Sequence, residues 1–223
     1  MSGRLQDKVA IITGATSGIG EATARIFASQ GASLVIAGRN VERGDALAQE
    51  LKAKYGDRFI FHPVNIIHDQ EMSDLIDAGV AHFGRLDCLF NNAGAGERSS
   101  VETVTEEEFD RVMRLLVGSV VFGMKHAARV MKDGGGGSII NNASIAAHRI
   151  KQGGYLYSGA KAAVSHLTRL AGVELGPFNI RVNAISPGAI ATPIFWGGSA
   201  RAQGLSDAEN AQKMAKLQGN LAN

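Results

Sequence analysis

The feature that most limits the fold of this chain is a short apolar run that passes directly into a glycine-rich loop and then into a helical pattern. Val9–Ile12 is apolar and largely β-branched, which is typical of a strand buried in a parallel sheet. Thr13–Gly20 follows at once, and from Glu21 apolar residues recur at helical spacing. The chain therefore begins with a strand, a glycine loop and a helix.

The three glycines of the loop have distinct expected tasks. Gly14 permits a tight turn, Gly18 lets the backbone approach a pyrophosphate, and Gly20 lets the helix pack closely on the strand. The helix N-terminus adds free N–H donors and a dipole that favours an anion. A glycine loop can also be only a turn, but its place between a strand and a helix favours a dinucleotide site.

Strand patterns alternate with helical patterns along the chain. Repeated βα order predicts a parallel sheet with helices on both faces. We expect an α/β fold with a doubly wound, Rossmann-like sheet in three αβα layers, formed by 1–223 as a single domain. The expected strands are Val9–Ile12, Ala32–Ala37, Arg58–Val64, Leu86–Phe90, Ser138–Asn142 and Ile180–Ile185. The expected helices begin at Glu21, span 41–54, 69–82, 106–131 (with Thr105 as N-cap) and 155–175, and end with a polar helix around 207–218.

The composition fits a globular protein and argues against several classes. The chain has 223 residues, 45% of them hydrophobic, and a net charge of +2, which suits one packed domain. Its basic residues do not cluster among aromatic ones, so we expect no nucleic-acid partner. The single cysteine, Cys88, excludes a disulfide within the chain and is expected in the core. Because no membrane-spanning run or signal-peptide pattern is present, we predict a cytoplasmic protein without membrane contact, and we predict no metal site.

Polar and glycine residues follow several of the expected strands. The carboxyl ends of parallel strands share one edge of the sheet, where ligands bind in such folds. Each residue alone could be an ordinary loop residue, but their convergence favours one binding site. They are Thr13–Gly20, Gly38, Arg39, Asn65, Asn91–Gly94, Ser144, Pro187 and Gly188.

Tyr157 and Lys161 stand four residues apart on an expected helix, so both can face one cleft. A free phenol has a pKa of about 10 and is a weak general base near neutral pH. We expect the Lys161 ammonium group to lower the pKa of Tyr157, and Ser144, thirteen residues before the tyrosine, to hold an oxygen. Tyr155 is a poorer candidate because Gly159 stands four residues after it.

Together these motifs resemble those of the short-chain dehydrogenase/reductases. The resemblance runs from about Leu5 to Thr192 and rests on Thr13–Gly20, Asn91–Gly94, Ser144, Tyr157–Lys161, Pro187-Gly188 and Thr192. It implies hydride transfer between a nicotinamide cofactor and a secondary alcohol or ketone. By this resemblance Tyr157 is the general acid and base, Lys161 lowers its pKa and holds the nicotinamide ribose, and Ser144 binds the substrate oxygen.

The resemblance also implies a set of cofactor-binding residues. An acidic residue at the end of the second strand would bind the ribose 2′-hydroxyl and repel a 2′-phosphate. This chain has Gly38 there and Arg39 next, which favours NADP(H), with NAD(H) possible. An exposed arginine that opens a helix is the alternative interpretation. The expected cofactor-binding residues are Gly14, Thr16, Ser17, Gly18, Ile19, Gly20, Arg39, Asn65, Ile66, Asn91, Ala93, Gly94, Tyr157, Lys161, Pro187, Gly188, Ile190 and Thr192.

Two features depart from the family pattern. Many members carry an asparagine that holds a water beside the lysine, and this chain has Leu116 there. Leucine cannot anchor a water, so we expect a slower or rerouted proton relay from Tyr157 through Lys161. The family continues past a lid into a further helix and strand, whereas this sequence stops at Asn223, and we interpret the sequence as truncated.

The substrate is the least defined part of the prediction. We expect 192–223 to form a lid, because 193–198 combines apolar aromatic residues with glycines; core packing of these residues is the alternative. A lid of this kind favours a cyclic or otherwise bulky apolar secondary alcohol or ketone. His148, Arg149 and Lys151 could instead face a polar group, and His148 is assigned no catalytic role.

Two other functions are alternatives to a dehydrogenase. Leu116 is compatible with a chain that binds nucleotide but reacts slowly, as a redox sensor or scaffold, although the complete catalytic set argues against it. Epimerase or dehydratase chemistry on a nucleotide sugar shares the Tyr-x-x-x-Lys pair, but the eight-residue glycine motif favours a dehydrogenase. In the family, helices at the positions of 106–131 and 155–175 make the subunit contact, which implies a homodimer or homotetramer.

Overall fold

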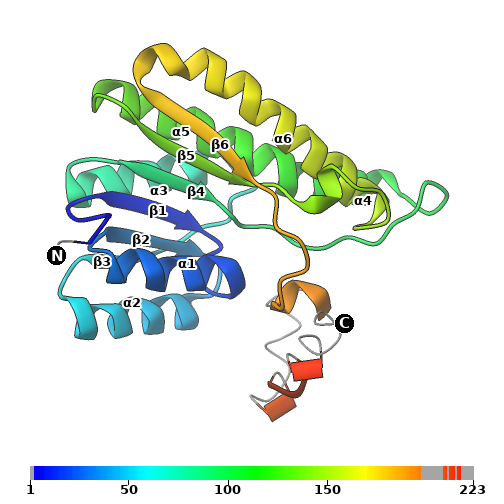
Figure 1. Cartoon of the computed structure of the whole chain (residues 1–223), viewed down its shortest axis with the longest axis horizontal. Coiled ribbons are helices and arrows are strands. Elements are labelled where there is room, and N and C mark those ends of the chain that lie inside the picture. The colour runs from blue at the N-terminus through cyan, green and yellow to red at the C-terminus, as the bar shows by residue number, and fades with distance from the viewer. Residues whose placement is uncertain (1–2, 197–207, 210, 214, 217–223) are drawn as a thin grey trace.

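The computed structural model describes residues 3–196, 208–209, 211–213 and 215–216 and has a parallel sheet at its centre (Figure 1). Its neighbouring strands pair in parallel in the order β3-β2-β1-β4-β5-β6. This order confirms the predicted doubly wound, Rossmann-like sheet. The strands are β1 (Val9–Thr13), β2 (Ser33–Gly38), β3 (Phe59–Pro63), β4 (Cys88–Asn91), β5 (Gly137–Asn142) and β6 (Ile180–Ile185).

Helices cover the sheet from both sides, as the three-layer prediction requires. Successive residues of a strand point to opposite faces. Ile11 of β1 belongs to the apolar cluster beneath α3, α5 and α6, whereas Ala10 and Ile12 belong to the cluster beneath α1 and α2 (Figure 1). The helices are α1 (Gly18–Ser29), α2 (Val41–Tyr55), α3 (Asp69–Phe83), α4 (Glu106–Met113), α5 (Ser119–Asp133) and α6 (Tyr155–Leu175).

The strand order reverses between β1 and β4, which are neighbours in the sheet although β2 and β3 lie between them in the sequence. The chain leaves β1 toward α1 on one face and leaves β4 toward α4 and α5 on the other side. A crevice forms where two such loops diverge. The glycine loop and Asn91–Gly94 therefore lie on the two sides of the expected ligand crevice.

Two helices differ from the prediction in a way that matters for the site. Helix α1 begins at Gly18 rather than Glu21, because Ser17 has the extended backbone of an N-cap residue, with φ of −166°. The expected helix 106–131 is divided by a π-helical segment, Arg114–Gly118. A wider turn of this kind often marks a functional site. The predicted cap of α4 is confirmed, since Thr105 Oγ1 accepts a hydrogen bond from the Glu108 N–H at 3.1 Å.

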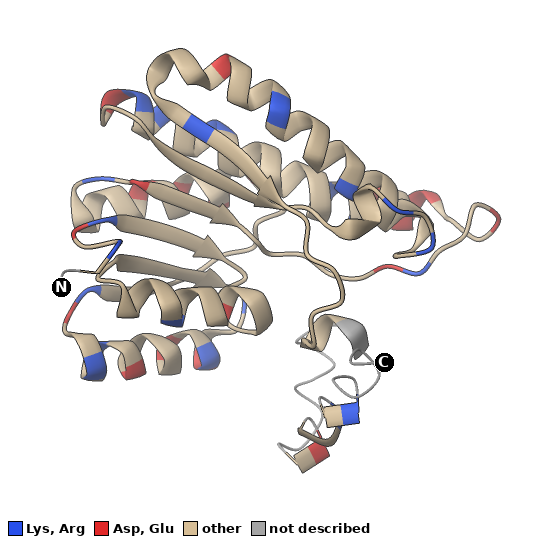
Figure 2. Ribbon diagram, viewed as in Figure 1, with Lys and Arg blue, Asp and Glu red and all other residues tan. Residues whose placement is uncertain are grey.

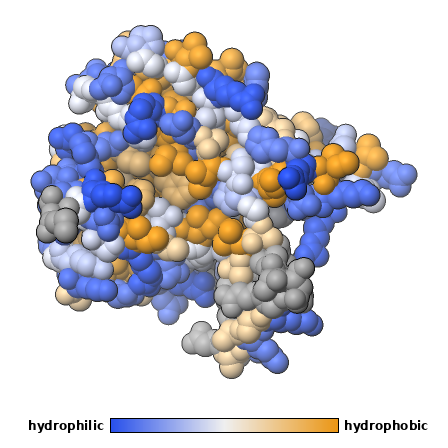
Figure 3. Space-filling model, in the orientation of Figure 1, coloured by the Kyte–Doolittle hydropathy of each residue, from blue (hydrophilic) through white to orange (hydrophobic). Residues whose placement is uncertain are grey.

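Charged residues of both signs are spread over helices and loops without a single dominant patch (Figure 2). Hydrophobic residues lie across the middle of the viewed face and also at its upper edge, with hydrophilic residues around them (Figure 3). Within the described ranges, no helix is both long and apolar enough to cross a membrane. Cys88, expected in the core, is half-buried and packs against the apolar cluster beneath α1 and α2, and burial raises the pKa of its thiol to about 11.

The C-terminal lid expected at 192–223 is described only in part. Pro193–Trp196 forms a short 3-10 helix after β6. The rest of the expected lid, and most of the polar helix expected at 207–218, lie outside the described residues.

Candidate active site

The glycine loop after β1 presents its backbone without side chains. Gly14 and Gly18 have φ of +66° and +57°, in the left-handed region that favours glycine. A Cβ on Gly14 would lie 2.8 Å from Cα of Ala93, and one on Gly20 would lie 2.3 Å from the carbonyl oxygen of Gly14. This bare cradle at the N-terminus of α1 fits the diphosphate of a dinucleotide cofactor.

Side-chain hydrogen bonds tie the ends of β1, β4 and β5 together. Thr13 Oγ1 accepts from the backbone N–H groups of Asn92 at 3.0 Å and Ala93 at 3.1 Å. The Asn92 amide donates to the carbonyl of Thr13 at 3.0 Å, and the Asn142 amide donates to Asn92 Oδ1 at 2.9 Å. These bonds fix the walls of the crevice relative to one another.

The structure brings together Ser144, Tyr157 and Lys161, the three residues predicted to be catalytic. Ser144 follows β5, and the other two stand in the first turns of α6. The Ser144 hydroxyl lies close enough to the Tyr157 phenol to lower its pKa. Lys161 is only 5% exposed, and its Nζ lies 5.7 Å from the centre of the Tyr157 ring. Lys161 Nζ also donates to the carbonyl oxygen of Asn142 at 2.5 Å.

The expected lowering of the Tyr157 pKa by Lys161 is not found. Burial of the phenol raises its pKa, and the hydrogen bond with Ser144 lowers it by less. The phenolate loses the stabilisation that water would give it, which is the usual effect of desolvation. Burial also lowers the pKa of Lys161 from 10.5 to about 8. In this geometry Tyr157 holds its proton at neutral pH.

Leu116 packs close to the lysine from the π-helical segment. Its side chain is 2% exposed and lies in a cluster with Leu156 and Ala160 of α6. A Cβ on Gly94 would lie 3.2 Å from Cδ2 of Leu116 and 4.0 Å from Nζ of Lys161. Both side chains therefore approach the same backbone position, and Leu116 adds apolar surface there.

The end of β2 has no acidic side chain. Gly38 is the last residue of the strand, and Arg39 follows with its side chain exposed. A Cβ on Gly38 would lie 3.0 Å from Cγ2 of Thr16. The end of β2 thus lies against the glycine loop, and Arg39 is the next residue after this contact.

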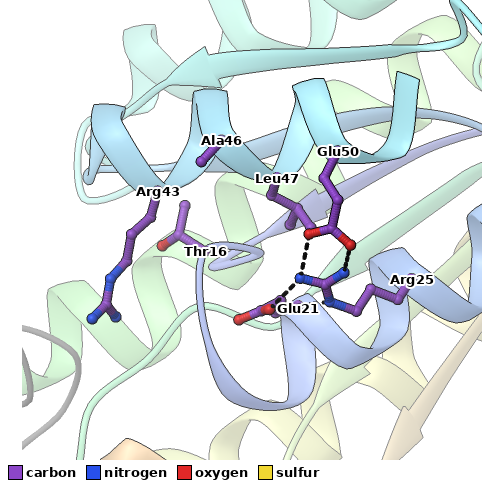
Figure 4. A pocket seen from close by; sticks show the side chains of 7 residues that line it. All are labelled: Thr16, Glu21, Arg25, Arg43, Ala46, Leu47 and Glu50. Atoms are coloured by element: carbon purple, nitrogen blue, oxygen red, sulfur yellow. Dashed lines mark hydrogen bonds and ion pairs between the residues drawn. The ribbon is translucent and has the colours of Figure 1, made fainter. Parts of the chain in front are cut away.

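A cavity of about 260 Å³ opens beside that loop, between α1 and α2 (Figure 4). Arg25 is held there by ion pairs with Glu21, at 2.9 Å, and with Glu50. Arg43 stands apart from this cluster near Thr16, and its guanidinium makes no ion pair with any described residue. Arg43 is therefore a second available cation near the end of β2, which the sequence pattern did not single out.

Thr192 and Pro187 come from the segment after β6. Thr192 is buried, and its Oγ1 donates to the carbonyl of Ile190 at 3.2 Å. A Cβ on Gly18 would lie 3.3 Å from Thr192, so this residue lies against the glycine loop. The carbonyl of Pro187 accepts a hydrogen bond from the Ile145 N–H at 2.9 Å, beside Ser144. Gly188 and Ile190 are exposed between these anchored positions.

Two of the predicted cofactor-binding positions differ in how their side chains lie. Asn65 follows β3 half-buried, and its backbone N–H donates to Glu71 Oε2 at 2.7 Å; Ile66 beside it is buried. The Asn91 side chain points into the sheet instead, where its amide donates to Asn141 Oδ1 at 2.9 Å. Asn91 thus braces β4 against β5, and its side chain is not directed at a ligand.

Glu97 was missed by the sequence patterns. It is buried in the segment after β4 and accepts a hydrogen bond from the backbone N–H of Tyr157 at 3.0 Å. A single glutamate in a loop sixty residues before the tyrosine carries no spacing signal. The only hint in the sequence is the lack of a capping side chain before Tyr155, where Gly154 stands.

A larger cavity, of about 710 Å³, lies next to the site without containing Tyr157. It is lined by Phe109 and Met113 of α4, by most residues of the loop 146–154 and by several residues at the start of α6. His148, Arg149 and Lys151 belong to this lining. His148 Nε2 is 3.1 Å from Oγ of Ser186.

Comparisons with known proteins agree with one another over most of the chain. The sequence model described as short chain dehydrogenase matches residues 8–202. The trans-4-hydroxycyclohexanecarboxylate dehydrogenase of Sinomonas cyclohexanicum is 37% identical over 202 residues, which cover 88% of this chain and 78% of that protein. The secoisolariciresinol dehydrogenase of Forsythia intermedia is 34% identical over 220 residues, covering 98% of this chain and 77% of that protein.

Solved structures agree with the sequence relatives. The L-sorbose reductase from Gluconobacter frateurii, complexed with NADPH and L-sorbose, matches with a TM-score of 0.82 and 36% identity, over 86% of this chain and 73% of that one. A short-chain type dehydrogenase/reductase from Mycobacterium ulcerans matches with a TM-score of 0.81 and 38% identity, over 84% of this chain and 70% of that one. This chain therefore belongs to the short-chain dehydrogenase family of oxidoreductases.

Proposed function

We propose that this protein transfers hydride between a nicotinamide cofactor and a secondary alcohol or ketone, with Tyr157 as general acid and base. The observation that carries the proposal is the meeting of Ser144, Tyr157 and Lys161 beside the bare glycine loop. A phenol, a hydroxyl and a buried cation are the groups that proton transfer to or from a substrate oxygen needs.

The chain's own residues handle the proton and the developing charge. The nicotinamide, when bound, supplies or accepts the hydride. In reduction, Tyr157 Oη gives its proton to the oxygen of the former carbonyl, and in oxidation it takes the proton back. Ser144 Oγ donates to that oxygen as negative charge builds. Because burial raises the pKa of Tyr157, the proton-donating form is favoured near neutral pH, which suits reduction.

The cofactor would be held by backbone and side chains from both sides of the crevice. The N–H groups at the start of α1, exposed by Gly18 and Gly20, would bind the diphosphate. Lys161 would hold the nicotinamide ribose, and Thr192, which lies against the glycine loop, would position the carboxamide.

NADP(H) is the cofactor that the end of β2 favours. A carboxylate that would repel a 2′-phosphate is replaced by Gly38, and Arg39 and Arg43 both stand near this end without an acidic partner among the described residues. Two guanidinium groups suit a phosphate through charge-assisted hydrogen bonds. NADPH in the sorbose reductase structure is consistent with this choice, and NAD(H) is the alternative.

The substrate is a secondary alcohol or ketone, with a cyclic, largely apolar compound as the first class to test. The name of the Sinomonas relative specifies a hydroxycyclohexanecarboxylate, which supports a ring as the carrier of the reacting carbon. The described start of the expected lid, Pro193–Trp196, follows Thr192 directly. A lid at this place would enclose the substrate against the catalytic residues.

A nucleotide-binding protein with little turnover is the second candidate, and Leu116 is the observation that favours it. The leucine offers no hydrogen bond near Lys161, so a water is not held there by this side chain. Under this alternative, the protein binds nucleotide through the glycine loop and acts as a redox sensor or scaffold.

We also propose a homodimer or homotetramer formed through α4, α5 and α6. Large apolar side chains are exposed on these helices at Phe109, Val121, Tyr155, Leu170 and Val173. Exposed apolar residues gathered on neighbouring helices often form subunit contacts. A cytoplasmic location stays a prediction.

The test is a spectrophotometric assay of nicotinamide reduction and oxidation, with NADP(H) and NAD(H) in parallel, against cyclic and aromatic secondary alcohols and ketones. Turnover with any of them supports the oxidoreductase. A folded protein that binds the cofactor, measured by protein fluorescence, but turns over none of a broad panel would overturn it in favour of the binding protein. Light scattering of the same sample tests the oligomer, and a monomer would contradict it.

A further inference from the structure

Helix α6 carries Tyr157 but begins without a cap of its own. Its N-cap residue is Gly154, which has no side chain, and its first turn contains no acidic residue. The first four N–H groups of a helix have no acceptor inside the helix. Tyr157 is the third residue of α6, so its N–H belongs to this set. The Tyr157 side chain therefore belongs to a helical turn that would fray unless another group accepts hydrogen bonds from these N–H groups.

Glu97 supplies the missing cap from a distant part of the chain. Its Oε2 accepts from the Tyr157 N–H at 3.0 Å, and its Oε1 accepts from the N–H of Ser99. The carbonyl of Ser99 in turn accepts from the Tyr155 N–H at 3.1 Å. Glu97 as a whole is 7% exposed. A buried negative charge at this end is also stabilised by the helix dipole. The segment after β4 and the first turn of α6 are thus joined by two hydrogen bonds.

The residues before α6 are shaped to receive this carboxylate and the tyrosine ring. A Cβ on Gly154 would lie 2.3 Å from the carbonyl oxygen and 2.7 Å from Oε2 of Glu97. A Cβ on Gly153 would lie 2.7 Å from Cδ1 of Tyr157. Neither contact allows a side chain. The glycine pair therefore lets Glu97 take the place that a capping side chain on the helix itself would occupy.

We propose that Glu97 is a positioning residue for Tyr157: its buried carboxylate fixes the first turn of α6 and so sets where the phenol meets the substrate oxygen. This rests on the proposed role of Tyr157. Without the carboxylate, the N–H of Tyr157 loses its acceptor and the turn loosens. A shift of about 1 Å in a reacting group costs on the order of 10²-fold in rate.

The kinetic test compares Glu97→Ala and Glu97→Gln with Glu102→Ala, a matched control from an exposed glutamate of the same segment. We expect Glu97→Ala to lower kcat per cofactor-binding site on the order of 10²-fold, with KM nearly unchanged. Glu97→Gln should recover part of the loss, because its amide oxygen can still accept from the Tyr157 N–H. Glu102→Ala should behave as wild type. Cofactor-binding sites are counted by fluorescence titration, so that a variant that is partly unfolded loses sites rather than kcat per site.

An unchanged kcat per site in Glu97→Ala would overturn the proposal, as would a glutamine variant no better than alanine. A second readout does not need turnover. Amide hydrogen exchange should show the N–H of Tyr157 losing protection in Glu97→Ala, while protection in the second half of α6 stays as in wild type. Equal exchange rates of the Tyr157 amide in both proteins would show that Glu97 does not cap α6. If the wild type had no oxidoreductase activity, this exchange result would still decide whether Glu97 holds Tyr157, so failure of the function and failure of the cap are distinguishable.

Discussion

At the end of β1 the crevice is shaped by consecutive residues, whereas at the end of β5 it is shaped by residues far apart in the sequence. The glycine loop depends on the backbone angles of Gly14 and Gly18 and on the close approach of Gly20 to the same loop. Tyr157 depends on Glu97, and Lys161 on the carbonyl of Asn142.

This contrast implies that the two ends of the site fail differently. A change in the glycine loop alters the cradle itself and should weaken cofactor binding. A change at the catalytic end leaves the cradle in place and should lower the rate at saturating cofactor. Lys161 is the exception, since it would touch both the ribose and the tyrosine.

Replacement of Lys161 should have the largest effect at the catalytic end. Lys161→Met keeps the chain length and apolar stem but removes the cation 5.7 Å from the Tyr157 ring. We expect kcat to fall by about 10²–10⁴-fold, with weaker cofactor binding as well. Lys54→Met, an exposed lysine of α2, is the control. A kcat within a few-fold of wild type would show that Tyr157 works without the cation.

Removal of the cations near β2 should affect only the choice of cofactor. Arg39→Ala and Arg43→Ala should each weaken NADP(H) binding by about 1.5–3 kcal/mol, the range for hydrogen bonds to charged groups, with exposed Arg39 at the lower end. NAD(H) binding and kcat should hardly change. Arg25→Gln is the matched control, because Arg25 lines the same cavity but is paired with Glu21 and Glu50. Equal losses for NADP(H) and NAD(H) would contradict the assignment to a 2′-phosphate.

A methyl group at Gly20 should damage the cradle. In Gly20→Ala the new Cβ would meet the carbonyl oxygen of Gly14 at 2.3 Å, and forcing extra volume into a packed site costs about 1–3 kcal/mol. Calorimetry should show weaker cofactor binding, while kcat at saturation stays close to wild type. Gly172→Ala in α6, whose Cβ would stand at an ordinary 3.4 Å from the Val182 carbonyl, should leave binding unchanged. A loss of kcat without a loss of affinity in Gly20→Ala would break the contrast between the two ends.

The smallest expected effect is a pH shift at Leu116. Burial gives Lys161 a pKa of about 8, so its ammonium group is present below that pH and is lost as the pH rises above it. Leu116→Asn adds a polar group beside the lysine and should move its pKa upward, on the order of one pH unit. The alkaline limb of the kcat profile for reduction should move to higher pH. Leu116→Met should leave it in place, and an equal shift in both variants would rule out the hydrogen-bonding explanation.

Most of the fold could be predicted because its signals are local. Apolar runs such as Val9–Ile12 placed the strands, and the order of the motifs fixed the parallel arrangement. The π-helical segment at Arg114–Gly118 was not predicted, because helical patterns continue on both sides of it and predict one unbroken helix. The start of α1 was misplaced because Gly18 and Ile19 carry no helix signal of their own.

The site was predictable where its residues form motifs and not where they depend on three-dimensional contacts. Ser144, Tyr157 and Lys161 were found by spacing and meet as expected. The predicted direction of the Tyr157 pKa was wrong, because burial raises this pKa by more than the hydrogen bond with Ser144 lowers it, and burial is not visible in a motif. Glu97 and Arg43 were missed for a similar reason, since only the fold brings Glu97 to the Tyr157 N–H and Arg43 near Thr16.

In the proposed mechanism Tyr157 transfers the proton while other residues bind the cofactor. The direct measurement compares wild type with Tyr157→Phe, using a substrate that the wild type turns over. For each protein, the rate of hydride transfer and the dissociation constant of the cofactor are determined on the same preparation. We expect an unchanged dissociation constant and a rate of hydride transfer lower by at least about 10²–10⁴-fold. A phenylalanine variant that binds the cofactor equally well and reacts at the wild-type rate would show that Tyr157 does not transfer the proton.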